Sequence, residues 1–242
     1  MLARVILTDN PWRFGSRRAT RKDNPSKKTR LGYGAKGNYD NGDMSTPEIA
    51  NLAPLIQAVA TPDAYCFMWV SEAMPTDHLQ ILDTWGFSPV CTAFVWVKLN
   101  PISGTPVFNP GKYTGTNIER CILARRNRKK YPCWHSTAKG EPKPSQVILA
   151  HRDRQDGTVI HSRKPPDAHE RIESWLTPYL QGHGMLELFA RQPRPGWITI
   201  GGDLSGRDIR EDLADLAAGK ILPSAPAKKV GQRGLFDEEE SA

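Results

Sequence analysis

Short apolar runs alternate with segments of helical periodicity along most of this 242-residue chain. The apolar runs are rich in β-branched and aromatic residues, which is typical of buried strands. The segments between them repeat apolar residues every three or four positions, which is the spacing of one helix face. The alternation predicts one doubly wound α/β domain whose sheet is mixed, because some mid-chain strands follow one another as hairpins.

The pattern also predicts where each element lies. Strands are expected at residues 5–7, 64–70, 92–99, 119–126, 146–152, 185–191 and 196–202, and helices at residues 45–60, 76–86, 167–180 and 207–219. Ser45, followed three residues later by Glu48, gives the first helix a capping-box signature. Lys220 begins a polar tail. We therefore expect a domain over residues 1–219 and a flexible tail over residues 220–242.

Composition argues against several classes of protein. No apolar stretch approaches the length of a membrane span, and the run at residues 5–7 is too short for a signal peptide. We therefore expect a cytoplasmic protein without a membrane partner. The four cysteines include no Cys-x-x-Cys pair, which argues against a disulfide framework. Cys133, His135 and His151 match no standard zinc spacing, so no metal is expected.

The net charge of +7 is unevenly distributed. Residues 13–36 hold nine Lys or Arg against one acid, Asp23, and a second basic cluster runs from Arg125 to Lys143. Basic segments of this kind favour a polyanionic partner such as nucleic acid. The alternative is a flexible surface whose charge serves only solubility.

The stretch "VILTDNPWRF" (residues 5–14) places polar and aromatic residues directly after the first apolar run. Asp9 falls at the carboxyl end of the expected strand, and open α/β sheets bind their ligands outside those ends. A carboxylate, a rigid turn and an aromatic ring therefore indicate a site. The alternative is a simple strand stop, because Asp, Asn and Pro all break strands.

Six motifs in the same order as in one known family decide between these alternatives. They are Asp9-Asn10-Pro11-Trp12, Trp85-Gly86-Phe87, Trp96-Val97-Lys98, His161-Ser162-Arg163-Lys164-Pro165, Glu187-Leu188-Phe189-Ala190-Arg191 and Gly196-Trp197. In these motifs the chain resembles the β-class adenine N6-methyltransferases. That family is typified by the catalytic subunit of the messenger-RNA N6-methyladenine writer (MT-A70-like) and has bacterial and phage members. The resemblance implies a Rossmann-like fold that uses S-adenosylmethionine.

The resemblance also assigns catalytic roles. The carboxylate of Asp9 and the backbone carbonyl that follows it would accept the two amino hydrogens of adenine, and Trp12 would offer a face to the flipped base. Asn10 stands where the family has Pro, so the acceptor remains while some rigidity before Pro11 is lost. We expect retained activity. The alternative is a silent relative that only binds nucleic acid.

Cofactor contacts follow from the same resemblance. Glu187, at a strand end, suits the ribose hydroxyls, and Lys164 would meet the methionine carboxylate. Many relatives carry Asn and an acid or amide after the Gly-Trp strand, where this chain has Gly201, Gly202 and Asp203, so Asp203 is the polar contact expected there. The other expected contacts, in the same motifs, are Ser162, Leu188, Phe189 and Arg191.

The family motifs do not separate DNA from RNA, because they contact only the base edge. We expect DNA as the substrate, with RNA as the alternative. Long basic side chains on a Gly-rich segment give affinity for phosphates with little base readout, so modest sequence specificity is expected. The expected nucleic-acid contacts are Arg13, Arg17, Arg18, Lys27, Lys28, Arg30 and Tyr39.

The tail contains the sequence Gln232-Arg233-Gly234-Leu235-Phe236, outside the methyltransferase resemblance. It is similar to the Gln-x-x-Leu-Phe peptides that dock on the bacterial sliding clamp, where Leu and Phe fill an apolar pocket and Gln bonds at its edge. Gln232, Leu235 and Phe236 therefore suggest clamp binding, which would favour DNA. The alternative is that Leu235 and Phe236 fold back onto the domain.

Overall fold

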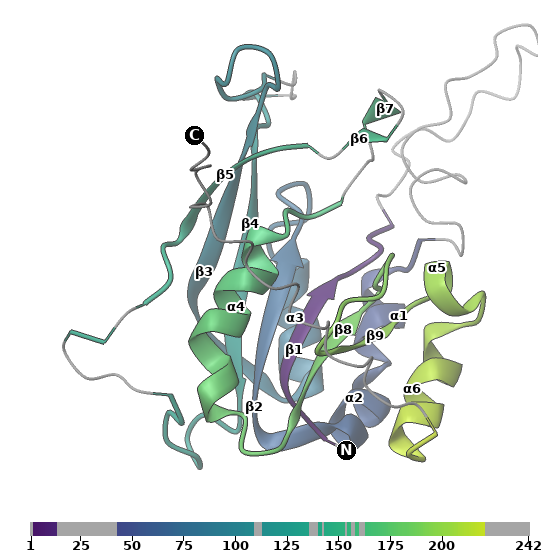
Figure 1. Cartoon of the computed structure of the whole chain (residues 1–242). Helices are drawn as coiled ribbons and strands as arrows, with labels where there is room; N and C mark the ends of the chain where they lie inside the picture. Colours follow the sequence, from purple (N-terminus) through teal and green to yellow (C-terminus); the bar gives the residue numbers. More distant parts are fainter. Residues whose placement is uncertain are drawn as a thin grey trace, which may run out of the picture.

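The structure, a computed structural model, describes residues 2–13, 43–108, 113–135, 140–141, 143–152, 154–155, 158–159 and 163–220. Its core is a seven-stranded sheet with the strand order β5-β3-β4-β2-β1-β8-β9 (Figure 1). Helices lie on both faces of this sheet, which confirms the predicted α/β, Rossmann-like class with a mixed sheet. The predicted domain boundary at residue 219 stays a prediction, since the tail lies outside the described residues.

Strand β1 (Ala3–Asp9) lies in the interior of the sheet. It pairs in parallel with β2 (Ala60–Val70) on one side and with β8 (Gly184–Leu188) on the other, and β9 (Trp197–Ile200) extends the sheet beyond β8. The first six residues of β1 are all buried. The continuous apolar run is therefore explained, because a central parallel strand is covered on both faces.

The other half of the sheet is mixed. β4 (Ile118–Arg126) runs antiparallel between β2 and β3 (Phe87–Leu99), and β5 (Val147–His151) pairs in parallel with β3 at the edge. The expected mid-chain hairpin is thus β3–β4. Because β4 is reversed, its first residues lie at the same edge of the sheet as the last residues of β1, β2 and β3.

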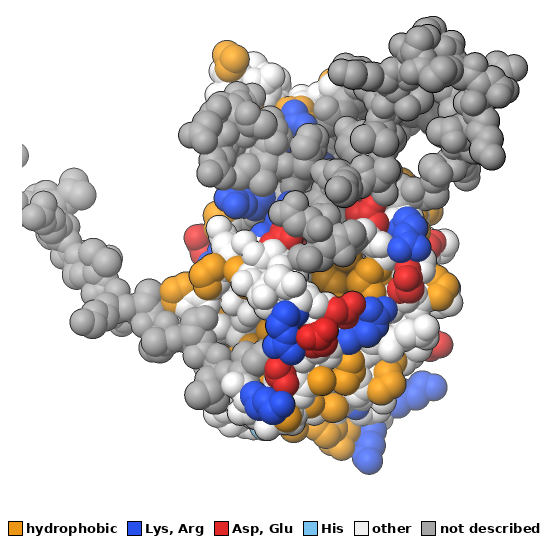
Figure 2. Space-filling view, turned by 90° about the vertical axis from the view of Figure 1, so that its right-hand side faces the viewer, with side chains coloured by type: hydrophobic (Ala, Val, Ile, Leu, Met, Phe, Trp, Pro, Cys, Tyr) orange, Lys and Arg blue, Asp and Glu red, His pale blue; other side chains and the backbone are white. Residues whose placement is uncertain are grey.

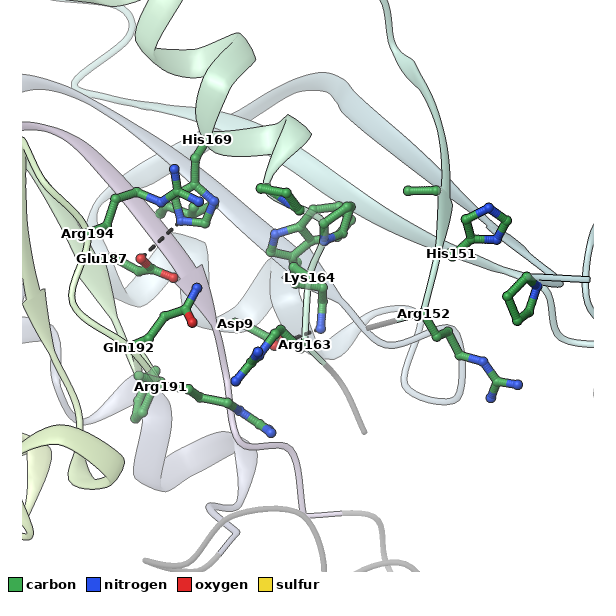
Figure 3. A pocket seen from close by; sticks show the side chains of 17 residues that line it. Asp9, His151, Arg152, Arg163, Lys164, His169, Glu187, Arg191, Gln192 and Arg194 are labelled. Atoms are coloured by element: carbon green, nitrogen blue, oxygen red, sulfur yellow. Dashed lines mark hydrogen bonds and ion pairs between the residues drawn. The ribbon is translucent and has the colours of Figure 1, made fainter. Parts of the chain in front are cut away.

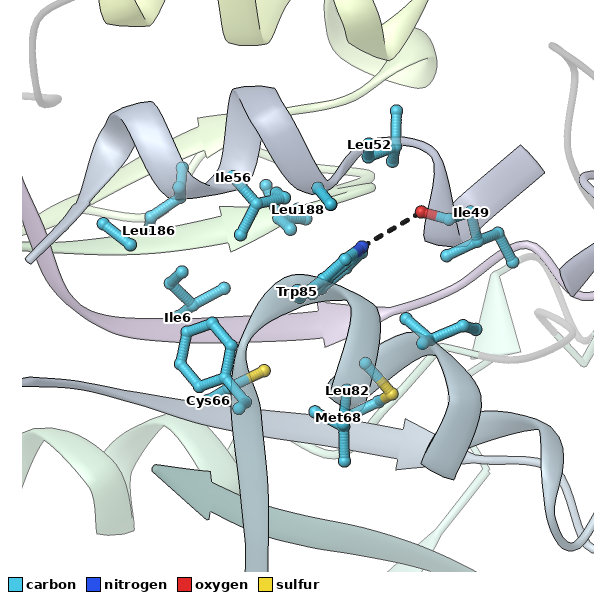
Figure 4. Packing of buried hydrophobic residues seen from close by; sticks show 14 of the residues in the cluster. Ile6, Ile49, Leu52, Ile56, Cys66, Met68, Leu82, Trp85, Leu186 and Leu188 are labelled. Carbon is cyan, nitrogen blue, oxygen red and sulfur yellow. Dashed lines mark hydrogen bonds between the residues drawn. The ribbon is translucent and has the colours of Figure 1, made fainter. Parts of the chain in front are cut away.

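Two hydrophobic layers sandwich the sheet. One is formed with α1 (Thr46–Ala50), α2 (Ala53–Val59), α3 (Asp77–Trp85) and α6 (Ile209–Ala217). The other is formed with α4 (Asp167–Leu176), which continues into the short turn η1 (Thr177–Tyr179). Figure 4 shows the first layer, where the buried Trp85 indole donates to the Ile49 carbonyl oxygen at 3.1 Å. Among the described residues, no helix has the length and hydropathy to cross a membrane.

The structure differs from the prediction in detail. The helix expected over residues 45–60 is divided into α1 and α2 because Pro54, in the first turn of α2, lacks the N–H that a continuous helix requires. The capping box is confirmed: Glu48 accepts from the Ser45 backbone N–H at 2.8 Å, and Ser45 Oγ accepts from the Glu48 N–H. The short α5 (Gly202–Ser205) and the pair β6 (Arg154–Gln155) and β7 (Thr158–Val159) were not predicted, since such short elements carry no period.

Candidate active site

The carboxyl edge of the parallel strands carries a cavity of about 570 Å³. Asp9 at the end of β1, Glu187 in β8 and Lys164 in the loop before α4 all line it (Figure 3). These residues come from three distant parts of the sequence. The structure thus places three of the predicted site residues together, where an open α/β sheet binds its ligand.

Lys164 connects Asp9 to a second carboxylate. Its ammonium Nζ lies 2.6 Å from Asp9 Oδ2 and 3.0 Å from Glu119 Oε2. Glu119, at the start of the reversed strand β4, is also paired at 2.5 Å with Lys98, at the end of β3. The Lys164 side chain is only 9% exposed, so these charges interact with little screening by water.

The pKa values of the two carboxyl groups, Asp9 and Glu119, are shifted in opposite directions. Burial raises the pKa of Asp9 above its usual value, and the neighbouring Glu119 carboxylate adds to the effect, while Lys164 opposes it. Burial also acts to raise the pKa of Glu119, but Lys164 and Lys98 outweigh it and the pKa is lowered. Asp9 is therefore the better proton acceptor of the two.

The turn after Asp9 is held by hydrogen bonds. The Trp12 backbone N–H donates to the Asn10 carbonyl at 2.9 Å, and Met44 N–H donates to the Pro11 carbonyl at 2.7 Å. The Asn10 side chain is buried and accepts from the Thr8 hydroxyl at 2.8 Å. These bonds order the position where the family has Pro. Asn10 is fully buried and lines neither cavity, so the predicted role of its carbonyl as an acceptor for adenine stays a prediction that requires movement.

Trp12 does not lie where its predicted role would place it. The Trp12 side chain is 5% exposed, packs in the core layer with α1 and α2, and does not line the cavity. Its predicted stacking on the base stays a prediction that requires movement. Trp69, which pairs with Asp9 in the β1–β2 register, lines the cavity instead, with its ring centre 5.7 Å from Lys164 Nζ.

The other side of the cavity is formed by β8 and the chain after it. Glu187 Oε2 lies 3.0 Å from Nε2 of the buried His169 in α4. Phe189 adopts the left-handed conformation (φ 57°) and lines the cavity with Arg191. The Leu188 side chain, predicted to border adenosine, is buried in the core and does not line the cavity.

A second cavity, of about 330 Å³, adjoins the first at Phe189, which lines both. Asp203 lines the second cavity and lies 3.9 Å from Arg191 of the first. Arg13 also lines it, and its guanidinium lies 3.2 Å from Glu48 and donates to the Asp43 carbonyl at 2.7 Å. The predicted cofactor residue Asp203 and the predicted nucleic-acid residue Arg13 therefore share one hollow.

The remaining predicted contacts lie outside the described residues and stay predictions. They are Ser162, Arg17, Arg18, Lys27, Lys28, Arg30, Tyr39, Gln232, Leu235 and Phe236.

The second basic cluster begins far from the cavity in the part of it that the structure describes. Arg126 at its start donates to the carbonyl of Ala60, the first residue of β2, whereas Asp9 pairs with Trp69 at the other end of that strand. Figure 2 shows a further face, beside α5 and α6, on which acidic and basic side chains are intermixed. Arg207 there contacts Glu211 and Asp215. Within the described ranges, neither Arg126 nor the face around Arg207 forms a uniform basic surface next to Asp9.

The three residues considered for zinc are separated. Cys133 and His135 contact each other at 3.2 Å and both contact the Tyr65 hydroxyl, while His151 lines the cavity at the carboxyl edge. Within the described part of the chain no group of three or more His, Cys, Asp or Glu side chains is arranged to hold a metal ion.

Sequence reasoning missed three residues of this site: Trp69 and His169, which line the cavity, and Glu119, which contacts the lining residue Lys164. The signal for Glu119 is that it is the one acidic residue of the strand "ERCILARR", whose other charged residues are arginines. Its partnership with Lys164 depends on β4 running antiparallel, which residue patterns do not reveal. Trp69 and His169 look like ordinary core residues of a strand and a helix.

Comparison with known proteins identifies the family. The sequence model of the MT-A70 family matches residues 3–203, so the chain belongs to the MT-A70 family of S-adenosylmethionine-dependent methyltransferases. It is similar to type II methyltransferase M.MunI of Mycoplasma sp, with 24% identity over 209 residues that cover 85% of this chain and 79% of M.MunI. It is also similar to N(6)-adenine-specific methyltransferase METTL4 of Mus musculus, with 26% identity over 203 residues. That match covers 83% of this chain but 37% of METTL4.

Proposed function

We propose that this protein is an S-adenosylmethionine-dependent methyltransferase that methylates N6 of adenine in DNA. The observation that carries the proposal is the placement of Asp9 in the cavity, inside a family match over residues 3–203. Two similar proteins are named as methyltransferases, and one of them as N(6)-adenine-specific. RNA is the second candidate substrate, because a site built around Asp9 reads the base edge and not the sugar.

The residues of the first cavity fit S-adenosylmethionine by their chemistry. The cofactor carries a carboxylate, an ammonium, ribose hydroxyls and an adenine ring. The cavity offers a cation in Lys164, a hydroxyl acceptor in Glu187 and an apolar ring in Phe189, within a volume that suits a small cofactor. When bound, the cofactor supplies an electrophilic methyl group on its sulfonium.

The proposed role of Asp9 is to make the adenine amine a better nucleophile. The lone pair of N6 is delocalised into the ring, and two hydrogen-bond acceptors on its hydrogens localise that pair. Asp9 and the Asn10 carbonyl are these acceptors in our proposal. After methylation N6 must release one proton, and a carboxylate whose pKa is raised by burial is suited to take it.

Nucleoside mass spectrometry tests this function. The protein is incubated with S-adenosylmethionine and, in parallel, single-stranded DNA, duplex DNA or RNA. We expect N6-methyladenine in DNA, with weak dependence on the sequence around the adenine. Methylation of RNA alone would replace DNA by the second candidate. Binding of nucleic acid without methylation of any substrate would favour the silent relative.

The basic segment, residues 13–36, is proposed to hold the phosphate backbone beside the target base. Replacing Arg17, Arg18, Lys27 and Lys28 by Gln should weaken binding to all sequences alike and flatten its salt dependence. An effect confined to one recognition sequence would instead make this segment a base reader.

Docking of the tail on a sliding clamp is a further proposal, supported only by Gln232, Leu235 and Phe236 in a polar, acidic terminus. A tail peptide should bind a purified bacterial clamp, and replacing both Leu235 and Phe236 by Ala should abolish binding. No binding at high micromolar peptide would remove the proposal. The cytoplasmic location that the sequence predicts is a separate expectation and stays a prediction.

A further inference from the structure

The first cavity has two walls of different composition, with Asp9 and Lys164 between them (Figure 3). The β8 wall consists of His169, Glu187, Phe189, Arg191, Gln192 and Arg194. The β5 wall consists of Pro101, Ala150, His151 and Arg152. Figure 3 shows Arg152 and Glu187 on opposite sides of Asp9.

Charges are balanced on the β8 wall. Arg191 lies 3.9 Å from Asp203, and Arg194 lies 3.7 Å from Glu173. Glu187 is within the wall itself. A neutral or zwitterionic ligand with hydroxyl groups suits such a surface, because it offers both donors and acceptors of hydrogen bonds.

The β5 wall is cationic. None of its residues is acidic, and Arg152, which follows the end of β5, has no hydrogen bond or ion pair among the residues that the structure describes. Its side chain is partly buried in the cavity lining, where a guanidinium gains more from an anion than it does at an open surface. A planar guanidinium matches the oxygens of a phosphate in a bidentate manner.

The position of this wall admits a polymer. β5 is one of the two edge strands of the sheet, so a chain can approach from beside it without crossing the core. The β8 wall is followed by β9 and then by α5 and α6. Of the two edges, and as far as the described residues show, the β5 edge is therefore the one along which an extended ligand can deliver a base to Asp9.

We propose that the β5 wall binds the phosphodiester backbone next to the target adenine, with Arg152 donating to its phosphate oxygens, and that the β8 wall receives the cofactor. This inference rests on the proposed function, since it assigns the two ligands of one methyl transfer to the two walls. It makes Arg152 a contact for the substrate and not for the cofactor.

The test compares Arg152→Gln with Arg128→Gln. Arg128 is an exposed arginine near the opposite end of the sheet and donates to the Pro89 carbonyl. Binding of a fluorescent DNA is measured at several salt concentrations, and binding of S-adenosylmethionine by calorimetry. Arg152→Gln should lower DNA affinity about tenfold at low salt and reduce the slope of log K against log salt by about one. Its cofactor affinity should equal that of the wild type, and Arg128→Gln should change neither.

A modified substrate locates the contact. One phosphate beside the target adenine is replaced by an uncharged methylphosphonate, in separate oligonucleotides for the 5′ and 3′ positions. One of these two oligonucleotides should bind the wild type more weakly than the unmodified DNA does. The same oligonucleotide should bind Arg152→Gln no more weakly than unmodified DNA does, because the substitution and the methylphosphonate remove the same contact. Fully additive losses at both positions would contradict the proposal.

The outcomes separate this inference from the function on which it rests. Loss of cofactor affinity in Arg152→Gln with unchanged DNA binding would overturn the assignment of the walls. A salt slope that Arg152→Gln leaves unchanged, while the wild type methylates DNA, would refute the inference alone. A reduced slope in a protein that methylates nothing would leave the wall assignment standing and refute the proposed function.

Discussion

Lys164 lies 2.6 Å from Asp9 and 155 residues away from it in the sequence. The same ammonium lies 3.0 Å from Glu119. Asp9 and Glu119 carry like charges that would repel each other in this half-buried site. Lys164 forms an ion pair with each of them and so offsets that repulsion. Burial raises the pKa of Asp9, and these two neighbours modify it in opposite directions, so substitutions at them give opposite predictions.

Replacing Lys164 by Met should shift the pH dependence of methylation. The carboxylate of Asp9 is the active form, so activity is lost as the pH falls through its pKa. Loss of the ammonium removes the group that lowers this pKa, so the acidic limb of the pH–rate profile should move to higher pH. Activity at neutral pH should fall about 100-fold. Lys164→Arg, which keeps the charge, should keep the limb close to that of the wild type, and thermal unfolding checks that both variants fold.

Glu119→Gln should move the acidic limb of the pH–rate profile to lower pH. Glu119 raises the pKa of Asp9, so its neutralisation should let Asp9 ionise at lower pH. The new amide is nearly isosteric with the carboxylate that it replaces, which limits structural disturbance. If Glu119 has only a structural role, the variant should lose stability while the acidic limb stays in place. A shift of the limb toward higher pH would contradict the conclusion that the Glu119 charge raises the pKa of Asp9.

His169 is predicted to position Glu187 for the cofactor. Nδ1 of His169 is buried without a hydrogen-bond partner among the described residues, so we assign its proton to Nε2, which faces Glu187. His169→Ala should weaken S-adenosylmethionine binding about tenfold, as expected for one hydrogen bond to a charged group, with kcat little changed. His169→Gln keeps an N–H donor and should restore most of the affinity. If the Gln and Ala variants bind the cofactor equally weakly, the hydrogen bond is not what matters.

Gly201 is predicted to be intolerant of any side chain. A Cβ at this residue would lie 2.7 Å from the Ala190 carbonyl oxygen and 2.8 Å from the Ala190 nitrogen, both backbone atoms that cannot rotate away. Gly201→Ala should therefore destabilise the protein by about 1–3 kcal/mol and displace the neighbouring Phe189. Urea unfolding measures the first effect and calorimetry of cofactor binding the second. Gly219→Ala, with no atom within 4 Å of the new Cβ, isolates the cost of a left-handed backbone.

Much of the fold could be predicted because the strands have a strong local signature. The run before Asp9 and the helix faces of α3, α4 and α6 are recognisable from apolar spacing alone. The division between α1 and α2 follows from Pro54, whose effect is local, whereas apolar spacing alone predicts one continuous helix. The strand order was not predictable, since pairing of β4 between β2 and β3 depends on contacts between residues far apart in the sequence.

The site could be predicted only where a motif marks it. Asp9, Lys164 and Glu187 belong to motifs of a known family, and all three line one cavity. Glu119 joins them solely because β4 is reversed, and Arg152 because β5 ends at the same edge. Trp12 shows the converse, since a residue inside the motif is packed into the core in this structure.

Asp9→Ala tests the central claim most directly. The variant and the wild type are incubated with S-adenosylmethionine and DNA, N6-methyladenine is measured by nucleoside mass spectrometry, and cofactor affinity is measured by calorimetry. We predict that methylation falls by about 100-fold or more while cofactor affinity and thermal stability remain close to those of the wild type. Turnover equal to that of the wild type would contradict the account, because no carboxylate would then be needed at the end of β1.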